Sequence, residues 1–257
     1  MKKINFLILF LFSTMLLIGK SFSSTESDEF IKLKETHNII CKNVTLSNLE
    51  EIGNNWKLQK KSKYLQLFAN KIEQKTLQIR LLYRSNQVQK IIFTFYKVPK
   101  RPILEIRSNN NCNIQSIRKI IYNKNFIPQE IHSINISDYK IDNTKLLNPE
   151  LPKLKSNNEK NIIALIDTGI NYSLKILHKN IAVKDRQILG FDFWDNDNKP
   201  FDSDPRQSPF YPRHHGTTVF SILAHDAPNS VIAPYRFPAL DMCKFKELVE
   251  HIVENSI

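Results

Sequence analysis

Hydrophobic and polar positions alternate in the middle of this chain. Leu77, Ile79, Leu81 and Tyr83 alternate with polar or second-face residues, and a second apolar run at 88–96 follows three polar residues. Two such runs around a short polar break predict a β-hairpin. Residues 103–107 predict another strand, and the pattern at 47–70 predicts a helix.

A different rhythm begins near residue 160. Residues 162–166 form a continuous apolar run, which is typical of a buried strand in a parallel sheet. Helical spacing follows Gly216, residues 231–237 predict a second strand, and residues 245–253 show one apolar helix face. A strand–helix–strand–helix order predicts an α/β fold with a parallel sheet.

These patterns divide the chain into four segments. We predict a signal peptide at 1–23, a small α+β or mostly β accessory or propeptide-like domain at 24–147, and the α/β domain at 160–257. Residues 148–159 contain two prolines and a polar run, so they predict a linker.

The N-terminus has the order of an export signal. Lys2 and Lys3 precede an apolar run at 4–18, and small residues follow at 21–24. We expect cleavage after Ser23 and a secreted or periplasmic protein. An uncleaved anchor is the weaker alternative, because a spanning helix needs about 20 apolar residues.

The formal net charge is +12, and the basic excess lies in residues 24–154. Such an excess is compatible with weak contact to an anionic envelope surface or to nucleic acid. A solvated lysine-rich face explains it more simply, so we predict no specific nucleic-acid partner. The oligomeric state is left open.

Three cysteines occur: Cys41, Cys112 and Cys243. Export would permit a disulfide, and Cys41 and Cys112 are the natural pair because they share a segment. Cys243 would then be free or buried. No cysteine–histidine spacing resembles a zinc site.

The first candidate for chemistry is Asp167, in Asp167-Thr168-Gly169 at the end of the run 162–166. A carboxylate at the end of a buried parallel strand points toward the edge where α/β enzymes bind ligands. Aspartic proteases use the same triplet in a two-aspartate dyad. This chain has no second copy, although a dimer would supply one.

The second segment reads His214-His215-Gly216-Thr217-Thr218-Val219, followed by Ala227-Pro228-Asn229 and the apolar run at 231–236. With Asp-Thr-Gly-Ile 48 residues before His215, the chain resembles the subtilisin-like serine proteases (peptidase S8) over about 159–240. The resemblance implies an incomplete subtilisin-like parallel sheet with flanking helices. It also implies a serine endopeptidase acting on protein or peptide substrates.

The same resemblance implies catalytic roles. His215 would be the general base for a serine nucleophile, and Asp167 would hold its imidazole in the required tautomer. A position at a helix start disfavours a charged imidazole, so we expect His215 to be neutral. His214 and His225 are expected to be surface or capping side chains. Both elements end at one sheet edge, so Asp167 and His215 are expected to converge.

An acidic connector lies between the two motifs. Several relatives in that family bind calcium, which takes clustered oxygen ligands, so calcium is a possible cofactor. A solvated acidic loop is the simpler interpretation. The residues are Asp192, Asp195, Asp197, Asp202 and Asp204.

The third triad member has no candidate in this sequence. In the family it lies in a Gly-Thr-Ser context well over a hundred residues beyond the histidine. Here 42 residues follow His215, and no glycine follows Gly216. Ser221, Ser230 and Ser256 lie in unrelated contexts. We therefore expect a protease fragment without activity of its own and with a marginally stable second domain. The alternative is an inactive protease-like exported protein that acts in binding.

Overall fold

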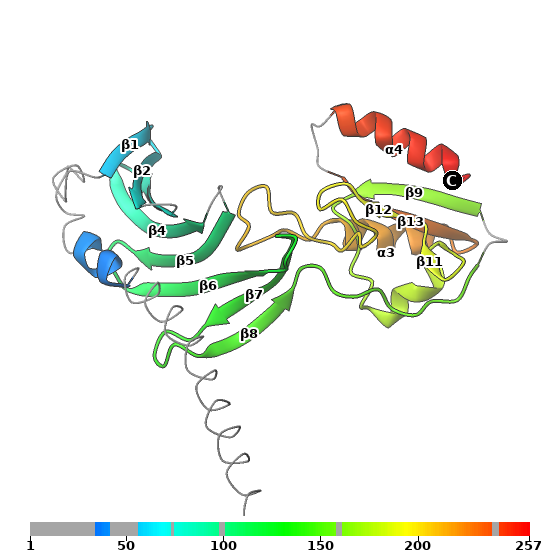
Figure 1. Cartoon of the computed structure of the whole chain (residues 1–257), viewed down its shortest axis with the longest axis horizontal. Coiled ribbons are helices and arrows are strands. Elements are labelled where there is room, and N and C mark those ends of the chain that lie inside the picture. Colours follow the sequence, from blue (N-terminus) through cyan, green and yellow to red (C-terminus); the bar gives the residue numbers. More distant parts are fainter. Residues whose placement is uncertain (1–33, 42–55, 73–74, 98–100, 158–160, 238–241) are drawn as a thin grey trace, which may run out of the picture. The chain divides into compact units, whose positions relative to one another are not determined.

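The computed structural model describes residues 34–41, 56–72, 75–97, 101–157, 161–237 and 242–257 (Figure 1). The chain divides into two compact units. One comprises Met1–Arg101 with Glu105–Gln115, and the other comprises Pro102–Leu104 with Ser116–Ile257. The predicted signal peptide and its cleavage position lie outside the described residues.

One sheet contains eight strands in chain order, coloured cyan to green in Figure 1. Adjacent strands pair antiparallel from the first strand to the fourth and from the sixth to the eighth, as expected for a meander joined by short turns. The strands are β1 (Trp56–Lys61), β2 (Leu65–Ile72), β3 (Lys75–Arg84), β4 (Gln87–Lys97), β5 (Arg101–Asn109), β6 (Ile114–Tyr122), β7 (Pro128–Ile134) and β8 (Ile141–Leu146).

The predicted hairpin is confirmed in β3 and β4. Ser85 and Asn86 connect the strands with φ angles of 52° and 63°. Left-handed geometry at both central residues suits the twist of the flanking strands. Alternate β3 residues Leu77, Ile79 and Leu81 are buried, as their spacing predicts.

The helix predicted over 47–70 is wrong where the structure describes it. Residues 56–61 and 65–70 belong to β1 and β2, and residues 47–55 lie outside the described part. Phe68 is buried and pairs with Ile79 of β3. Cross-strand pairing on a hydrophobic sheet face therefore outweighs a helical local pattern.

The predicted fold class is also wrong for the chain as a whole. The structure is mostly β and is dominated by the eight-stranded antiparallel sheet, not by an α/β sheet of the subtilisin-like kind with flanking helices. The strand-rich stretch 56–146 is longer than the segment whose motifs suggested that class. Hairpins of adjacent strands need only short turns, so this stretch builds its sheet locally.

A second sheet has three parallel strands and lies in the unit that contains Ser116–Ile257, together with β7 and β8 of the large sheet. Its order is β12 (Phe191–Asp192), β13 (Ser230–Arg236) and β9 (Asn161–Asp167). The expected strands at 162–166 and 231–237 are thus confirmed as elements. The unit also contains the 3-10 helix η2 (Lys175–Asn180), β10 (Val183–Lys184), β11 (Gln187–Ile188), and helices α3 (Gly216–Asp226) and α4 (Met242–Glu254).

The central strand β13 is covered on both faces. Ile232 packs in a cluster with Phe220 of α3, whereas Val231 and Ala233 pack with Leu248 of α4. Since successive strand residues point to opposite faces, α3 and α4 cover opposite sides of this sheet (Figure 1). Both-face burial explains the apolar run of β13.

The segment predicted as a linker makes several contacts within its unit. The Asn148 amide donates to Asp197 Oδ2 at 2.9 Å, Tyr172 Oη donates to the Pro149 carbonyl at 2.7 Å, and Leu154 is buried in a core cluster. The domain boundaries stay a prediction. Among the residues that the structure describes, no helix has the length and apolar character needed to cross a membrane.

Candidate active site

Asp167 is the last residue of β9. Its parallel partner in β13 is Arg236, so both lie at the carboxyl edge of the three-stranded sheet. The Asp167 side chain is 15% exposed, and its Oδ1 accepts the backbone amide of Thr168 at 2.7 Å. The strand end therefore holds the carboxylate in one orientation.

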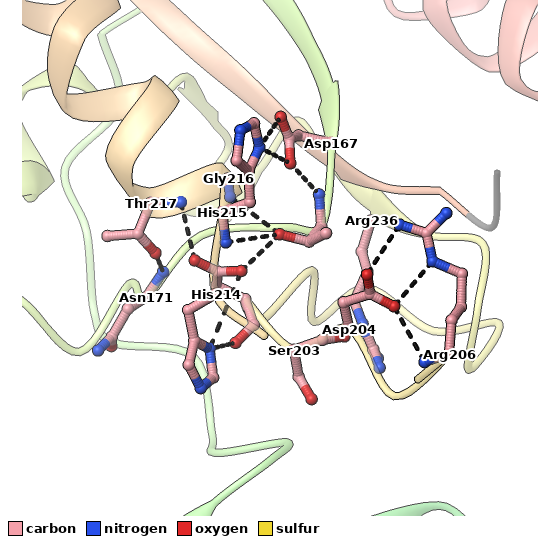
Figure 2. A network of polar contacts seen from close by, with 12 residues as sticks. Asp167, Asn171, Ser203, Asp204, Arg206, His214, His215, Gly216, Thr217 and Arg236 are labelled. Atoms are coloured by element: carbon pink, nitrogen blue, oxygen red, sulfur yellow. Dashed lines mark hydrogen bonds and ion pairs between the residues drawn. The ribbon is translucent and has the colours of Figure 1, made fainter. Parts of the chain in front are cut away.

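His215 immediately precedes α3 and faces this carboxylate. Its Nδ1 lies 2.9 Å from both Oδ1 and Oδ2 of Asp167 (Figure 2). The predicted convergence of the two side chains is therefore observed, across 48 residues of sequence. The His215 side chain is 68% exposed, so the imidazole is accessible beyond its carboxylate partner.

The Asp167 carboxylate determines the protonation behaviour of His215. Its hydrogen bond and its negative charge raise the pKa of His215 above the ordinary histidine value. The direction of this shift is opposite to the one expected from a helix start alone. A carboxylate at 2.9 Å outweighs the partial positive charge of one helix end.

Thr168 and Asp202 hold the start of α3 against β9. The Thr168 hydroxyl accepts the amides of His215 and Gly216, at 3.2 and 2.9 Å, and donates to Asp202 Oδ1 at 2.6 Å. The other oxygen, Asp202 Oδ2, accepts the Thr217 amide at 2.8 Å (Figure 2). These bonds satisfy the first amides of the helix, which have no partner inside it.

Two glycines allow this close approach. A Cβ on Gly216 would lie 2.0 Å from the Gly169 carbonyl oxygen, so only glycine fits there. Gly169 has a φ of 91°, and its own Cβ would lie 2.5 Å from the Pro200 carbonyl oxygen. The glycines of both motifs thus have a steric role in bringing Asp167 and His215 together.

Arg236 organises the acidic connector from the end of β13. Its guanidinium is buried, and NH1 donates to Asp192 Oδ2 at 2.7 Å and to Asp195 Oδ2 at 2.5 Å. Its Nε donates to the Ser203 carbonyl at 2.8 Å. Burial alone would lower the pKa of Arg236, but the two carboxylates raise it overall, so the residue stays charged.

The remaining connector carboxylates also have partners in the protein. Asp197 accepts from Asn148 and from the Lys199 amide, and Asp204 forms a bidentate pair with Arg206. No cluster of three metal-ligating side chains occurs in the described part of the chain. The five carboxylates considered for calcium thus make internal contacts, and calcium as a cofactor stays a prediction.

Two further histidines, His214 and His225, have partners other than Asp167. The His214 Nδ1 contacts the carbonyl of Asp202, and His225 pairs with its neighbour Asp226 at 2.8 Å on the surface. The serines at 221 and 230 lie within α3 and at the start of β13, and the Ser221 hydroxyl donates back to the Thr217 carbonyl.

Sequence reasoning missed Thr168, Asp202 and Arg236 as structural supports of the pair. Arg236 offered one signal, because a charged residue that ends a fully apolar strand needs a buried partner. Thr168 lies inside the recognised motif, but nothing in the sequence linked it to Asp202 34 residues later.

Comparison with known proteins adds no relative to this picture. No family model, no curated protein and no solved structure matches the chain. The site therefore has to be interpreted from its own geometry.

The arrangement is suited to accepting a proton. Because Nδ1 donates to the Asp167 carboxylate, the neutral imidazole carries its lone pair on Nε2. An exposed Nε2 next to a fixed carboxylate can take a proton from a hydroxyl and hold the resulting imidazolium in place.

Proposed function

We propose that this chain carries the aspartate and general base of an exported serine endopeptidase of the subtilisin-like kind, with protein or peptide substrates. The observation that supports it is the Asp167–His215 contact at 2.9 Å, formed by two motifs in the order of that family. His215 Nε2 would take the proton of a serine hydroxyl, and Asp167 would stabilise the imidazolium.

The same contact favours a serine-type mechanism over an aspartic dyad. In a dyad two carboxylates share one proton at close range. Here both oxygens of Asp167 face a histidine ring nitrogen, which favours the ionised carboxylate. The aspartic alternative would need His215 to move away.

The serine nucleophile is not among the residues that form hydrogen bonds with His215 in the described part of the chain. Within the described residues, His215 forms hydrogen bonds with Asp167, with Thr168 and with the backbone of α3. A base without a nucleophile has nothing to activate. We therefore expect the 257-residue chain alone to show no peptidase activity above its Asp167→Ala variant.

The test of the proposal uses the protein isolated from its natural source. Wild type is expected to cleave casein and to react with a fluorophosphonate probe, and His215→Ala is expected to lower both at least about a thousandfold. The exposed His225→Ala variant is the matched control and should retain both. Absence of cleavage and labelling in wild type, or cleavage independent of His215, would overturn the proposal.

A second candidate is a protease-like exported protein that binds an anionic envelope surface. It is favoured by the exposed lysines Lys57, Lys60 and Lys61 on β1, an outer strand of the eight-stranded sheet. Vesicles rich in anionic lipid should retain the chain at low salt and release it above about 0.5 M, where screening is strong. Lysines on an exposed edge strand also oppose aggregation by strand pairing. If the chain did not bind the vesicles, this would be the only role left for the three lysines.

A further inference from the structure

A buried group of thiol, imidazole and hydroxyl side chains lies in the first unit. Cys41 Sγ lies 3.6 Å from His37 Nε2 and 3.8 Å from Ser108 Oγ. His37 Nε2 in turn lies 3.0 Å from Ser108 Oγ. All three residues are buried, with exposed fractions of 7%, 1% and 0% for Cys41, His37 and Ser108.

The helix over 34–41 and strand β4 position the imidazole. His37 and Cys41 are four residues apart on this helix, so they share one face. The ring of His37 packs edge-on against Phe93, with centroids 4.9 Å apart. His37 Nδ1 lies 3.3 Å from Asn38 Oδ1, and a hydrogen donated there leaves the lone pair on Nε2, next to the Ser108 hydroxyl and the Cys41 thiol.

A second thiol reaches this group from the turn between β5 and β6. The Cys112 thiol is near enough to contribute to the raised pKa of Cys41, and the Cys112 side chain is half-buried. Cys112 has a φ of 63°, a left-handed conformation that a side chain other than asparagine or glycine rarely adopts. The Cys112 amide donates to the Asn109 carbonyl at 3.1 Å, which holds the turn in this form.

We propose that Cys41 and Cys112 form a thiol–disulfide site, with Cys112 as the outer thiol, Cys41 as the inner thiol and His37 as the proton acceptor. The oxidant is a low-molecular-weight or protein disulfide. Access decides the order of the two thiols, because Cys41 is buried and Cys112 is half-buried.

Two exchange steps account for all atoms. The Cys112 thiolate attacks one sulfur of the donor disulfide, giving a mixed disulfide and releasing one donor thiolate, which takes the Cys112 proton. Cys41 then attacks the Cys112 sulfur, His37 takes the Cys41 proton and passes it to the second departing thiolate. The products are one intramolecular disulfide and two donor thiols.

The surroundings of Cys41 explain the need for a base. Burial, followed by the Cys112 thiol, raises the pKa of Cys41 to about 12, so the free thiol supplies little nucleophile. Burial lowers the pKa of His37, so its ring is neutral and able to accept the proton.

The experiment uses the full chain carrying Cys243→Ser, so that two thiols remain. The reduced protein is mixed with oxidised glutathione, quenched with iodoacetamide at timed intervals and mapped by mass spectrometry. We expect a peptide cross-link between residues 41 and 112, preceded by glutathione on Cys112 and never on Cys41. Persistent alkylation of both cysteines, or glutathione on Cys41 first, would overturn the proposal.

Variants separate the steps. In Cys41→Ser the intramolecular disulfide cannot close, so the mixed disulfide between glutathione and Cys112 should accumulate. Its formation does not depend on His37. His37→Gln should slow closure at least about tenfold while leaving the first step unchanged, and the exposed His225→Gln should change neither. Equal closure rates in wild type and His37→Gln, with unchanged circular dichroism, would remove His37 from the mechanism. Failure of Cys41→Ser to retain glutathione would remove Cys112 as the outer thiol.

Discussion

The His215 ring lies mostly in solvent, yet its ionisation is controlled by one neighbour. Asp167 contributes a hydrogen bond and a negative charge, and together these raise the His215 pKa. A histidine whose pKa is raised on folding adds stability below the ordinary value of about 6.5. That contribution is lost as the pH rises through the folded-state pKa.

Replacing Asp167 should therefore be visible at His215. In Asp167→Asn the charge and the strong acceptor are gone, so the pKa of His215 should fall toward the ordinary value. The measurement is an NMR titration of the His215 Cε1 proton. His225 provides an internal control, since its partner Asp226 is unchanged. An unshifted His215 curve would mean that the contact at 2.9 Å does not persist in solution.

Arg236 differs from the other connector arginine by its burial. Its side chain is 4% exposed and bridges Asp192 and Asp195, which are 0% and 10% exposed. Arg206 pairs with Asp204 but is 43% exposed. Removing a buried charge leaves its partners uncompensated, whereas an exposed pair is already solvated.

Urea unfolding of matched variants measures this difference. Arg236→Met should lower the free energy of unfolding by about 3–5 kcal/mol, because two carboxylates stay buried without a cation. Arg206→Met should change it by about 1 kcal/mol or less. Similar losses in the two variants would contradict the role assigned to Arg236.

At the scale of elements, the start of α3 depends on side chains from two other segments. His215 is the N-cap residue but its side chain caps nothing. The Thr168 hydroxyl and the Asp202 carboxylate accept the first amides instead. The helix start and the strand end that carry the candidate pair are thus tied together by the same hydrogen bonds.

Thr168→Val keeps the shape of the side chain and removes its hydroxyl. We expect a loss of about 1–2 kcal/mol, typical of a lost cap, together with a weaker pairing of His215 and Asp167. Denaturant unfolding and the His215 titration report the two effects. Thr218→Val, on the exposed side of α3, serves as the control and should preserve the His215 titration curve.

The elements also show how far the sequence could be interpreted. The β3–β4 hairpin was predictable because its turn and its buried alternation are local. The β1–β2 region was not, since Phe68 is placed by its β3 partner Ile79 rather than by its own neighbours. The motifs predicted Asp167 and His215, whereas Asp202 and Arg236 depend on contacts between distant segments.

At the scale of the whole molecule, the α/β motifs occupy a smaller share of the chain than the antiparallel sheet. The three-stranded sheet nevertheless positions the pair, because β9 and β13 end together at Asp167 and Arg236. A mostly β chain can thus contain a short parallel sheet whose edge bears the candidate chemistry. The proposed function rests on that edge and not on the overall class.

Surface chemistry in the second unit predicts the behaviour of the molecule in solution. Phe245, Val249 and Val253 lie four residues apart along α4 and are 45%, 43% and 69% exposed, whereas Leu248 on the same helix is fully buried. A continuous apolar stripe in water promotes association. The buried residue instead contributes to the core beneath the helix.

A triple change of Phe245, Val249 and Val253 to serine should therefore reduce self-association. Light scattering of the full chain at increasing concentration should show less large material, and the free energy of unfolding should fall by no more than about 2 kcal/mol, because the three side chains are partly exposed and Phe245 also contacts Phe237. Leu248→Ala is the matched control, because truncating a core leucine costs about 2–5 kcal/mol and leaves the stripe intact. Unchanged scattering in the triple variant would show that this stripe does not mediate association.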